Sequence, residues 1–125
     1  MKIAVMIVRI LMGLIFSASA IAVLFKLVPQ PELHGPVKTF NEGIAAAGYF
    51  IPMLKSIELI CGLLLISGRF ISLVTLVLLP ITINIFAFHA FLAPEGLPVA
   101  IFLLLGNIFL AYVYRRNYDA LLIAK

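Results

Sequence analysis

The sequence predicts an all-α protein that crosses a membrane as a bundle of four helices. Hydrophobic residues make up 65% of the 125 residues and charged residues only 11%, whereas soluble domains average about 45–50% and about 25%. Four apolar stretches, each bounded by charged or turn-forming residues, are long enough to cross a bilayer. A soluble chain of this length could not bury so much apolar surface in one core, so lipid must surround most of it.

The first expected span covers about residues 5–27. Between Arg9 and Lys26 it has 16 uncharged residues, and the long side chains of both cations can reach the lipid headgroups. The Ala-Ser-Ala sequence at residues 18–20 resembles the cleavage site of a signal peptide. Because Arg9 interrupts the apolar region before it, we expect no cleavage and a membrane span instead.

A loop with a short amphipathic helix is expected next. Residues 29–31 and 35–36 contain the prolines and the glycine of turns, and a helix is expected at about residues 36–48. Its apolar face is formed by Val37, Phe40, Ile44 and Ala47. Such a helix would lie along the membrane interface, either as a lid or as a simple tether.

The other three spans are expected at about residues 50–68, 70–91 and 97–114, so that residues 1–125 form a single transmembrane domain. The second of these spans is unusual because it contains two charged residues, Lys55 and Glu58. The last one ends in tyrosines and arginines, which anchor a helix end at the membrane interface.

Charge asymmetry predicts the orientation. Four spans place both termini and the turn at residues 68–69 on one side. That side carries six cations, namely Lys2, Arg9, Arg69, Arg115, Arg116 and Lys125, whereas the other side carries Lys26 and Lys38. The positive-inside rule therefore predicts cytoplasmic N- and C-termini, and we expect a multi-pass protein of a bacterial inner membrane.

The net charge of +4 forms no basic stripe, so nucleic-acid binding is not expected.

Polar side chains inside the spans mark the candidate site, because burying them in lipid is costly. At 1.5 Å per residue, Glu58 and Asn84 lie about 12 and about 10 Å below the extracytoplasmic ends of their spans, and His89 lies about 3 Å below. The complete candidate set is Glu58, Lys55, Asn84, His89, Ser17, Asn107 and Lys26. The cytoplasmic half offers little besides Ser72 and Thr75. We therefore expect a polar pocket that opens to the extracytoplasmic side.

Glu58 is the leading candidate within this set. An unpaired carboxyl in lipid would be protonated, whereas Lys55, three residues earlier on the same face, or Lys26 could hold it ionised. The structural alternative is a Lys–Glu pair that fixes helix rotation, with Asn84 and Asn107 as interhelical hydrogen-bonding groups. No metal site is expected, because the histidines and carboxylates lack the spacing of a ligand set.

Several short motifs have the pattern of a known family. They are Arg9-x-x-x-Gly13, Phe25-Lys26, Gly48-Tyr49-Phe50-Ile51-Pro52, Pro80, Asn84-Ile85-Phe86-Ala87-Phe88-His89 and Pro94-x-Gly96. The most specific stretch runs from Glu58 through Gly62 to Gly68-Arg69. In these features nearly the whole chain resembles the DoxX-like family of small four-helix integral membrane proteins. The resemblance implies that Glu58, Asn84 and His89 line a shared intramembrane site.

Three functions remain open at this stage. The leading hypothesis is an accessory or binding protein, chaperone-like in its role, whose pocket holds a lipid-like ligand or the transmembrane helix of a partner protein. The second is a small membrane subunit of a quinone-linked oxidoreductase, a class that the resemblance includes, with quinone as the cofactor. The third is a proton-coupled transporter in which Glu58 changes its protonation state. Membrane lipids are expected partners, and either a monomer or a homodimer fits the sequence.

Overall fold

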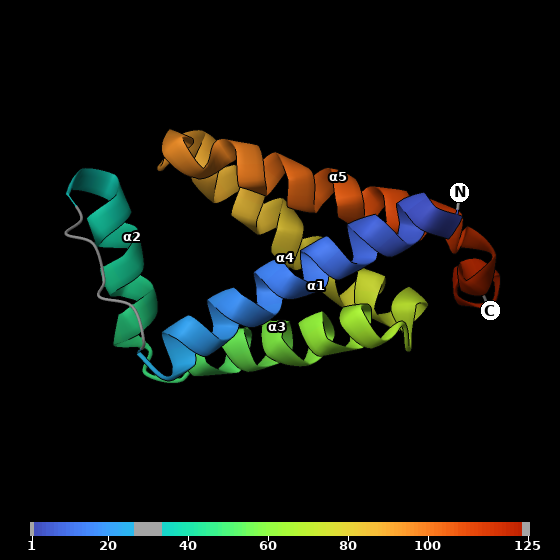
Figure 1. Cartoon of the computed structure of the whole chain (residues 1–125). Coiled ribbons are helices and arrows are strands. Elements are labelled where there is room, and N and C mark those ends of the chain that lie inside the picture. Colours follow the sequence, from blue (N-terminus) through green and yellow to red (C-terminus); the bar gives the residue numbers. More distant parts are fainter. Residues whose placement is uncertain (1, 27–33, 124–125) are drawn as a thin grey trace.

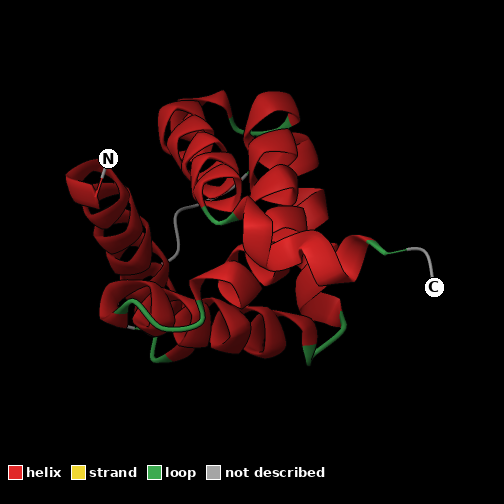
Figure 2. Cartoon of the chain, turned by 90° about the vertical axis from the view of Figure 1, so that its right-hand side faces the viewer, coloured by secondary structure: helices red, strands yellow, loops and turns green. Residues whose placement is uncertain are grey.

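Four helices of the computed structural model are long and apolar enough to cross a membrane. The structure describes residues 2–26 and 34–123, which contain helices and turns but no strand (Figure 2). The elements are α1 (Lys2–Leu24), α2 (Gly35–Ala46), α3 (Phe50–Ser67), α4 (Ile71–Phe91), the short 3-10 helix η1 (Pro94–Gly96), α5 (Leu97–Val113) and the 3-10 helix η2 (Arg115–Leu122). The predicted all-α, four-span fold is therefore confirmed. The turn expected at residues 29–31 lies outside the described residues.

The spans form two antiparallel pairs, α1 with α3 and α4 with α5 (Figure 1). Small residues allow the first pair to approach closely. A Cβ atom on Gly13 would lie only 2.7 Å from the carbonyl oxygen of Gly62, and one on Gly62 only 2.9 Å from that of Gly13. Because lipid is as apolar as the helix surfaces, close backbone packing of this kind is a main source of helix association in membranes.

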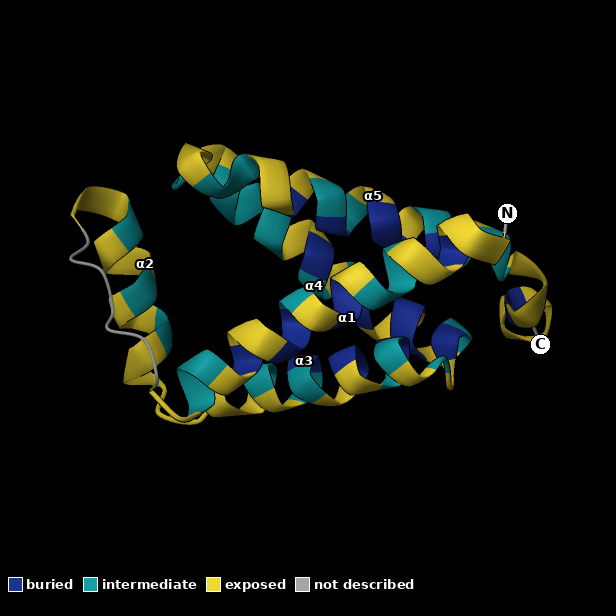
Figure 3. Cartoon of the chain, viewed as in Figure 1, coloured by how far each residue is buried: buried dark blue, intermediate teal, exposed yellow. Residues whose placement is uncertain are grey.

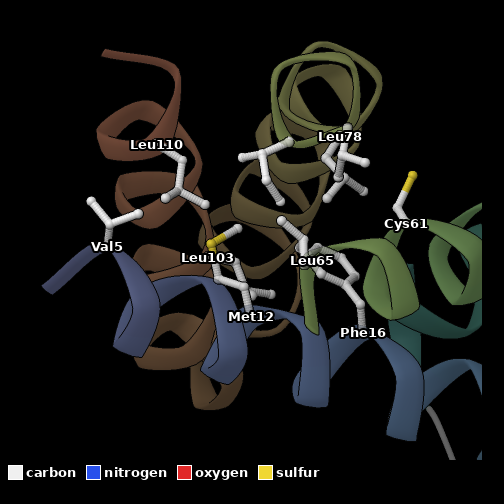
Figure 4. Packing of buried hydrophobic residues seen from close by; sticks show 10 residues of the cluster. Val5, Met12, Phe16, Cys61, Leu65, Leu78, Leu103 and Leu110 are labelled. Carbon is white, nitrogen blue, oxygen red and sulfur yellow. The ribbon is translucent and has the colours of Figure 1, made fainter. Parts of the chain in front are cut away.

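The hydrophobic core lies where the two pairs meet, in the half of the bundle nearer the termini (Figures 3 and 4). Fully buried Met12, Leu65, Leu78 and Leu110 bring one side chain from each span into it. Packing decreases toward the opposite end, because α1 has no buried residue after residue 20 and α4 none after residue 82. Likewise, α3 has none before residue 58 and α5 none before residue 100.

Helix α2 runs across the less tightly packed end of the spans (Figure 1). It has no buried residue of its own. It touches α3, and the ring of Phe40 lies 5.2 Å from the ring of Phe88 on α4. The expected amphipathic helix is therefore present, and it connects the two helix pairs at this end.

Both chain ends lie at the opposite end of the bundle (Figure 1). The turn between α3 and α4 is also there, because the guanidinium of Arg9 packs directly against Gly68. Gly68 has a φ of 80°, a left-handed conformation that glycine adopts without steric cost. The expected grouping of both termini with this turn is thus confirmed, and we call this side of the molecule the terminal end.

Candidate intramembrane site

A partly buried ion pair within α3 is hydrogen-bonded to α1. The Nζ atom of Lys55 lies 3.4 Å from Oε1 of Glu58 and donates to the Oγ atom of Ser19 at 3.3 Å. Glu58 is only 3% exposed, and Ser19 belongs to α1. Of the two candidate partners of Glu58, Lys55 is the one that pairs with it within the described residues, and the same ammonium group joins two spans.

The position of Glu58 follows from helical periodicity. It lies one turn before the buried residues Cys61 and Gly62 and two turns before Leu65, so it belongs to the face of α3 that enters the bundle. Moving a carboxylate out of water costs several kcal/mol, which only a close counter-charge and hydrogen bonds can offset. Lys55 provides both, because residues three apart on a helix are neighbours.

Ser17 adds an unpartnered hydroxyl next to this pair. Its side chain is buried, and its Oγ atom has no hydrogen-bond partner among the described residues. It packs against Gly62, one helical turn along α3 from Glu58. A buried polar atom without a partner is costly, so an added ligand group or water at this position would be stabilised.

Asn84 does not meet Glu58. It is exposed, whereas the buried face of α4 is formed by Val74, Leu78 and Thr82. The expectation that Asn84 and Glu58 face each other is therefore wrong, because the packing of α4 turns Asn84 away from this face. Asn84 instead shares a side of α4 with Phe88, one turn further on.

His89 and Lys26 also stay apart from the ion pair. His89 is half-buried, and its Nδ1 atom lies 2.8 Å from the carbonyl oxygen of Ile85. Since a carbonyl only accepts, Nδ1 carries a proton and Nε2 is the remaining ring nitrogen. The imidazole packs against Gly96, where a Cβ atom would collide with it. Lys26 is exposed and, in the part of the chain that the structure covers, does not pair with Glu58.

Asn107 contacts a different part of the bundle from the one expected. It is fully buried on α5, and its Nδ2 atom donates to the backbone carbonyl of Thr75 on α4 at 3.2 Å. Its Oδ1 atom is buried without a partner in the described structure. The antiparallel pairing of α4 with α5 sets this register, so Asn107 belongs with Thr75 and not with Ser17 or Glu58.

A second group of polar residues lies around Thr75, although the sequence suggested little polarity there. We call it the terminal polar cluster, and its members are Ser72, Thr75, Asn107, Asn117 and Tyr118. The carbonyl of Ser72 accepts from the hydroxyls of Thr75 at 2.9 Å and Tyr118 at 3.0 Å, and these two hydroxyls also contact each other. Asn117 donates to the hydroxyl of Ser72 at 2.6 Å. Two members, Asn117 and Tyr118, lie in η2 beyond the last span, and hydrophobic periodicity in the sequence does not predict that this segment packs against α4.

The described residues contain no group of three or more histidine, cysteine or carboxylate side chains that could together hold a metal ion. Two hollows occur at the terminal end, on either side of Tyr114. Neither of them is lined by Glu58, Asn84 or His89.

The fold and the ion pair define a class of protein: a small multi-pass membrane protein of four helices with a partly buried charged pair within one span. A family model described as DoxX matches residues 4–90, which extend from α1 almost to the end of α4. The chain belongs to the DoxX family. No curated protein and no solved structure matches the chain.

Proposed function

We propose that this DoxX-family protein is a membrane accessory protein that binds a lipid-like ligand with a polar head between its two helix pairs, beneath α2. Quinones and phospholipids have this chemistry. The observation that carries the proposal is the position of Glu58. It is the first buried residue of α3 counted from the α2 end, and it therefore stands at the boundary between the packed core and the less tightly packed part of the bundle.

The apolar part of the proposed ligand would lie against half-buried side chains. Ile57, Ile81, Ile85 and Phe102 border the core and are packed against it without being buried themselves. Such side chains leave apolar surface against which a lipid tail can pack through van der Waals contacts. Apolar walls with a few convergent polar groups are typical of small-molecule sites.

The polar part would be recognised by the groups around the ion pair. The ammonium of Lys55 has three donors, of which two are directed to Glu58 and Ser19. The third donor and the unpartnered Oγ atom of Ser17 favour a ligand with a carbonyl or hydroxyl oxygen.

Helix α2 is suited to act as a cover for this region. It touches α3 and contacts α4 through Phe40 and Phe88, and none of its residues is buried. Gly35 and Gly48, both with positive φ, lie at its start and just beyond its end. Because few buried contacts hold it, opening of α2 would cost little, and a ligand could enter from the membrane interface.

The orientation is part of the proposal. Among the described residues, Lys2, Arg9, Arg69, Arg115 and Arg116 lie at the terminal end, and the positive-inside rule would therefore place both termini in the cytoplasm and α2 at the extracytoplasmic surface. The membrane would be a bacterial inner membrane, and the ligand would enter from its outer leaflet. Labelling of single cysteines introduced into α2 with a membrane-impermeant reagent, in a Cys61→Ser background, would succeed in intact cells only in this orientation.

Native mass spectrometry of gently solubilised protein tests the ligand. The wild-type protein is expected to carry a co-purified lipid or quinone, and Glu58→Gln is expected to lose at least half of it, because a neutral amide holds the Lys55 ammonium less strongly than a carboxylate. Glu42→Gln is the matched control, since Glu42 is exposed on α2. An empty wild-type protein, or equal ligand content in both variants, would contradict the proposal. A bound membrane protein in place of a ligand would instead favour helix recognition.

A further inference from the structure

The hollow at the beginning of α1 has the composition of a site for an anionic headgroup. It has a volume of about 330 Å³ and lies between the start of α1 and the end of α5. Its lining residues are Lys2, Val5, Met6, Arg9, Val113 and Tyr114. Two of these side chains are cations, one carries a phenolic hydroxyl, and none is a carboxylate.

Arg9 is held in place but lacks a partner for part of its guanidinium. Its Nη1 atom packs against Gly68, where a Cβ atom would collide with it. Its Nε atom is buried and has no hydrogen-bond partner within residues 2–26 and 34–123. The ion pair formed in these residues lies between Lys55 and Glu58, so the positive charge of Arg9 is not neutralised by a described carboxylate. Asp119, the acidic residue of η2, is exposed and does not line the hollow.

The walls of the hollow indicate a lipid and not a soluble anion. Met6 is 46% exposed on the outside of α1, where it faces the surroundings of the bundle, and Val5 and Val113 extend the apolar surface inward. Guanidinium groups bind phosphate through two parallel hydrogen bonds. The N-terminal end of α1 adds a partial positive charge at the same place.

We propose that this hollow binds the phosphate of an anionic phospholipid. Arg9 and Lys2 contact the phosphate, Tyr114 hydrogen-bonds to the headgroup, and one acyl chain runs along Met6. The lipid belongs to the leaflet at the terminal end, opposite to the leaflet from which the proposed ligand of Glu58 would enter. The inference is therefore independent of the function proposed above. The lipid would also hold α1 against α5, because Arg9 lies on α1 and Tyr114 directly follows α5.

Lipid titration followed by native mass spectrometry tests the site. The purified full-length protein in detergent is titrated with phosphatidylglycerol and, separately, with phosphatidylcholine. The wild-type protein is expected to bind phosphatidylglycerol more tightly. Arg9→Gln and Lys2→Gln are each expected to weaken this binding about fivefold, since a basic residue near an anionic lipid contributes about that factor. Arg9→Lys keeps the charge but loses the forked geometry, so its affinity is expected to fall between those of Arg9→Gln and the wild type.

Arg116→Gln is the matched control. It removes one positive charge from the same end, but Arg116 is exposed and does not line the hollow, so less than a twofold change is expected. Lys2→Gln serves as the second variant if Arg9→Gln does not fold, because Lys2 is exposed at the start of α1. Equal losses in Arg116→Gln and Lys2→Gln would mean diffuse surface attraction and would overturn the site. Equal affinity for the two lipids, or displacement of phosphatidylglycerol by inorganic phosphate, would overturn it too.

Discussion

The two polar regions of this bundle accommodate polar side chains among membrane-spanning helices in different ways. The Lys55–Glu58 pair puts formal charges beside the α1–α3 contact, with Lys55 lying 3.4 Å from Glu58 and donating to Ser19 at 3.3 Å. The terminal polar cluster uses only neutral hydroxyl, amide and carbonyl groups, joined by bonds as short as 2.6 Å. In lipid a neutral group that is fully hydrogen-bonded costs little, whereas a charge remains costly even when it is paired.

This difference suggests different roles. The terminal polar cluster binds η2 to α4 through neutral hydrogen bonds, and within the described residues it leaves the buried Oδ1 atom of Asn107 without a partner. Its bonds between segments suit it to holding the structure together. The ion pair lies where the packed core ends, beside the unpartnered hydroxyl of Ser17. Formal charges within a membrane span cost more than neutral polar groups, and they are more typical of a functional site than of a purely structural one. Three variants, taken from the largest expected effect to the smallest, test the comparison.

Separating α1 from α3 is expected to have the largest effect. Gly62→Leu places a side chain where even a Cβ atom would lie 2.9 Å from the backbone oxygen of Gly13. Because backbone cannot give way as a flexible side chain does, the free energy of unfolding should fall by about 3 kcal/mol. Titration with a denaturing detergent in mixed micelles measures this loss. Gly43→Ala is the control, since nothing lies within 4 Å of a Cβ atom at Gly43 in α2, and its stability should be unchanged or slightly higher.

Removing one member of the ion pair is expected to have an intermediate effect. Lys55→Met leaves the carboxyl of Glu58 buried without its counter-charge, and the free energy of unfolding should fall by about 2 kcal/mol. The double variant Lys55→Met/Glu58→Gln should recover more than half of this loss, because no charge is then left unpaired. Lys38→Met, at an exposed position in α2, should change little. A double variant as unstable as Lys55→Met would show that the pair does not act through charge.

Loosening the terminal polar cluster is expected to have the smallest effect. Tyr118→Phe removes the hydroxyl that bonds to Ser72 and contacts Thr75, which should lower the stability by about 1 kcal/mol. The segment 115–122 should also become more sensitive to limited proteolysis in the purified protein. Tyr112→Phe keeps the ring beneath Arg115 at an exposed position and serves as the control. Equal protease sensitivity of the two variants would mean that η2 is not held by this cluster.

The features that could be predicted are those that depend on residues close together in the sequence. The four spans follow from the length of apolar stretches, and the pairing of Lys55 with Glu58 follows from their spacing on one helix. The position of Asn84 was not predictable in the same way. A membrane helix is apolar toward lipid as well as toward its neighbours, so its apolar residues do not reveal which side enters the bundle. For the same reason, the sequence could not predict the contact between Asn107 and Thr75, which lie 32 positions apart.

The sequence by itself determined that the chain is a four-span membrane bundle, that both termini lie with the turn at Gly68, and that a charged pair lies within α3. Only the tertiary structure decided that Asn84 faces outward, that η2 folds back onto α4, and that Arg9 lines a hollow beside Tyr114. The reason is that helix formation and span length depend on local composition. The rotation and register of each helix depend instead on side chains from distant segments that pack together.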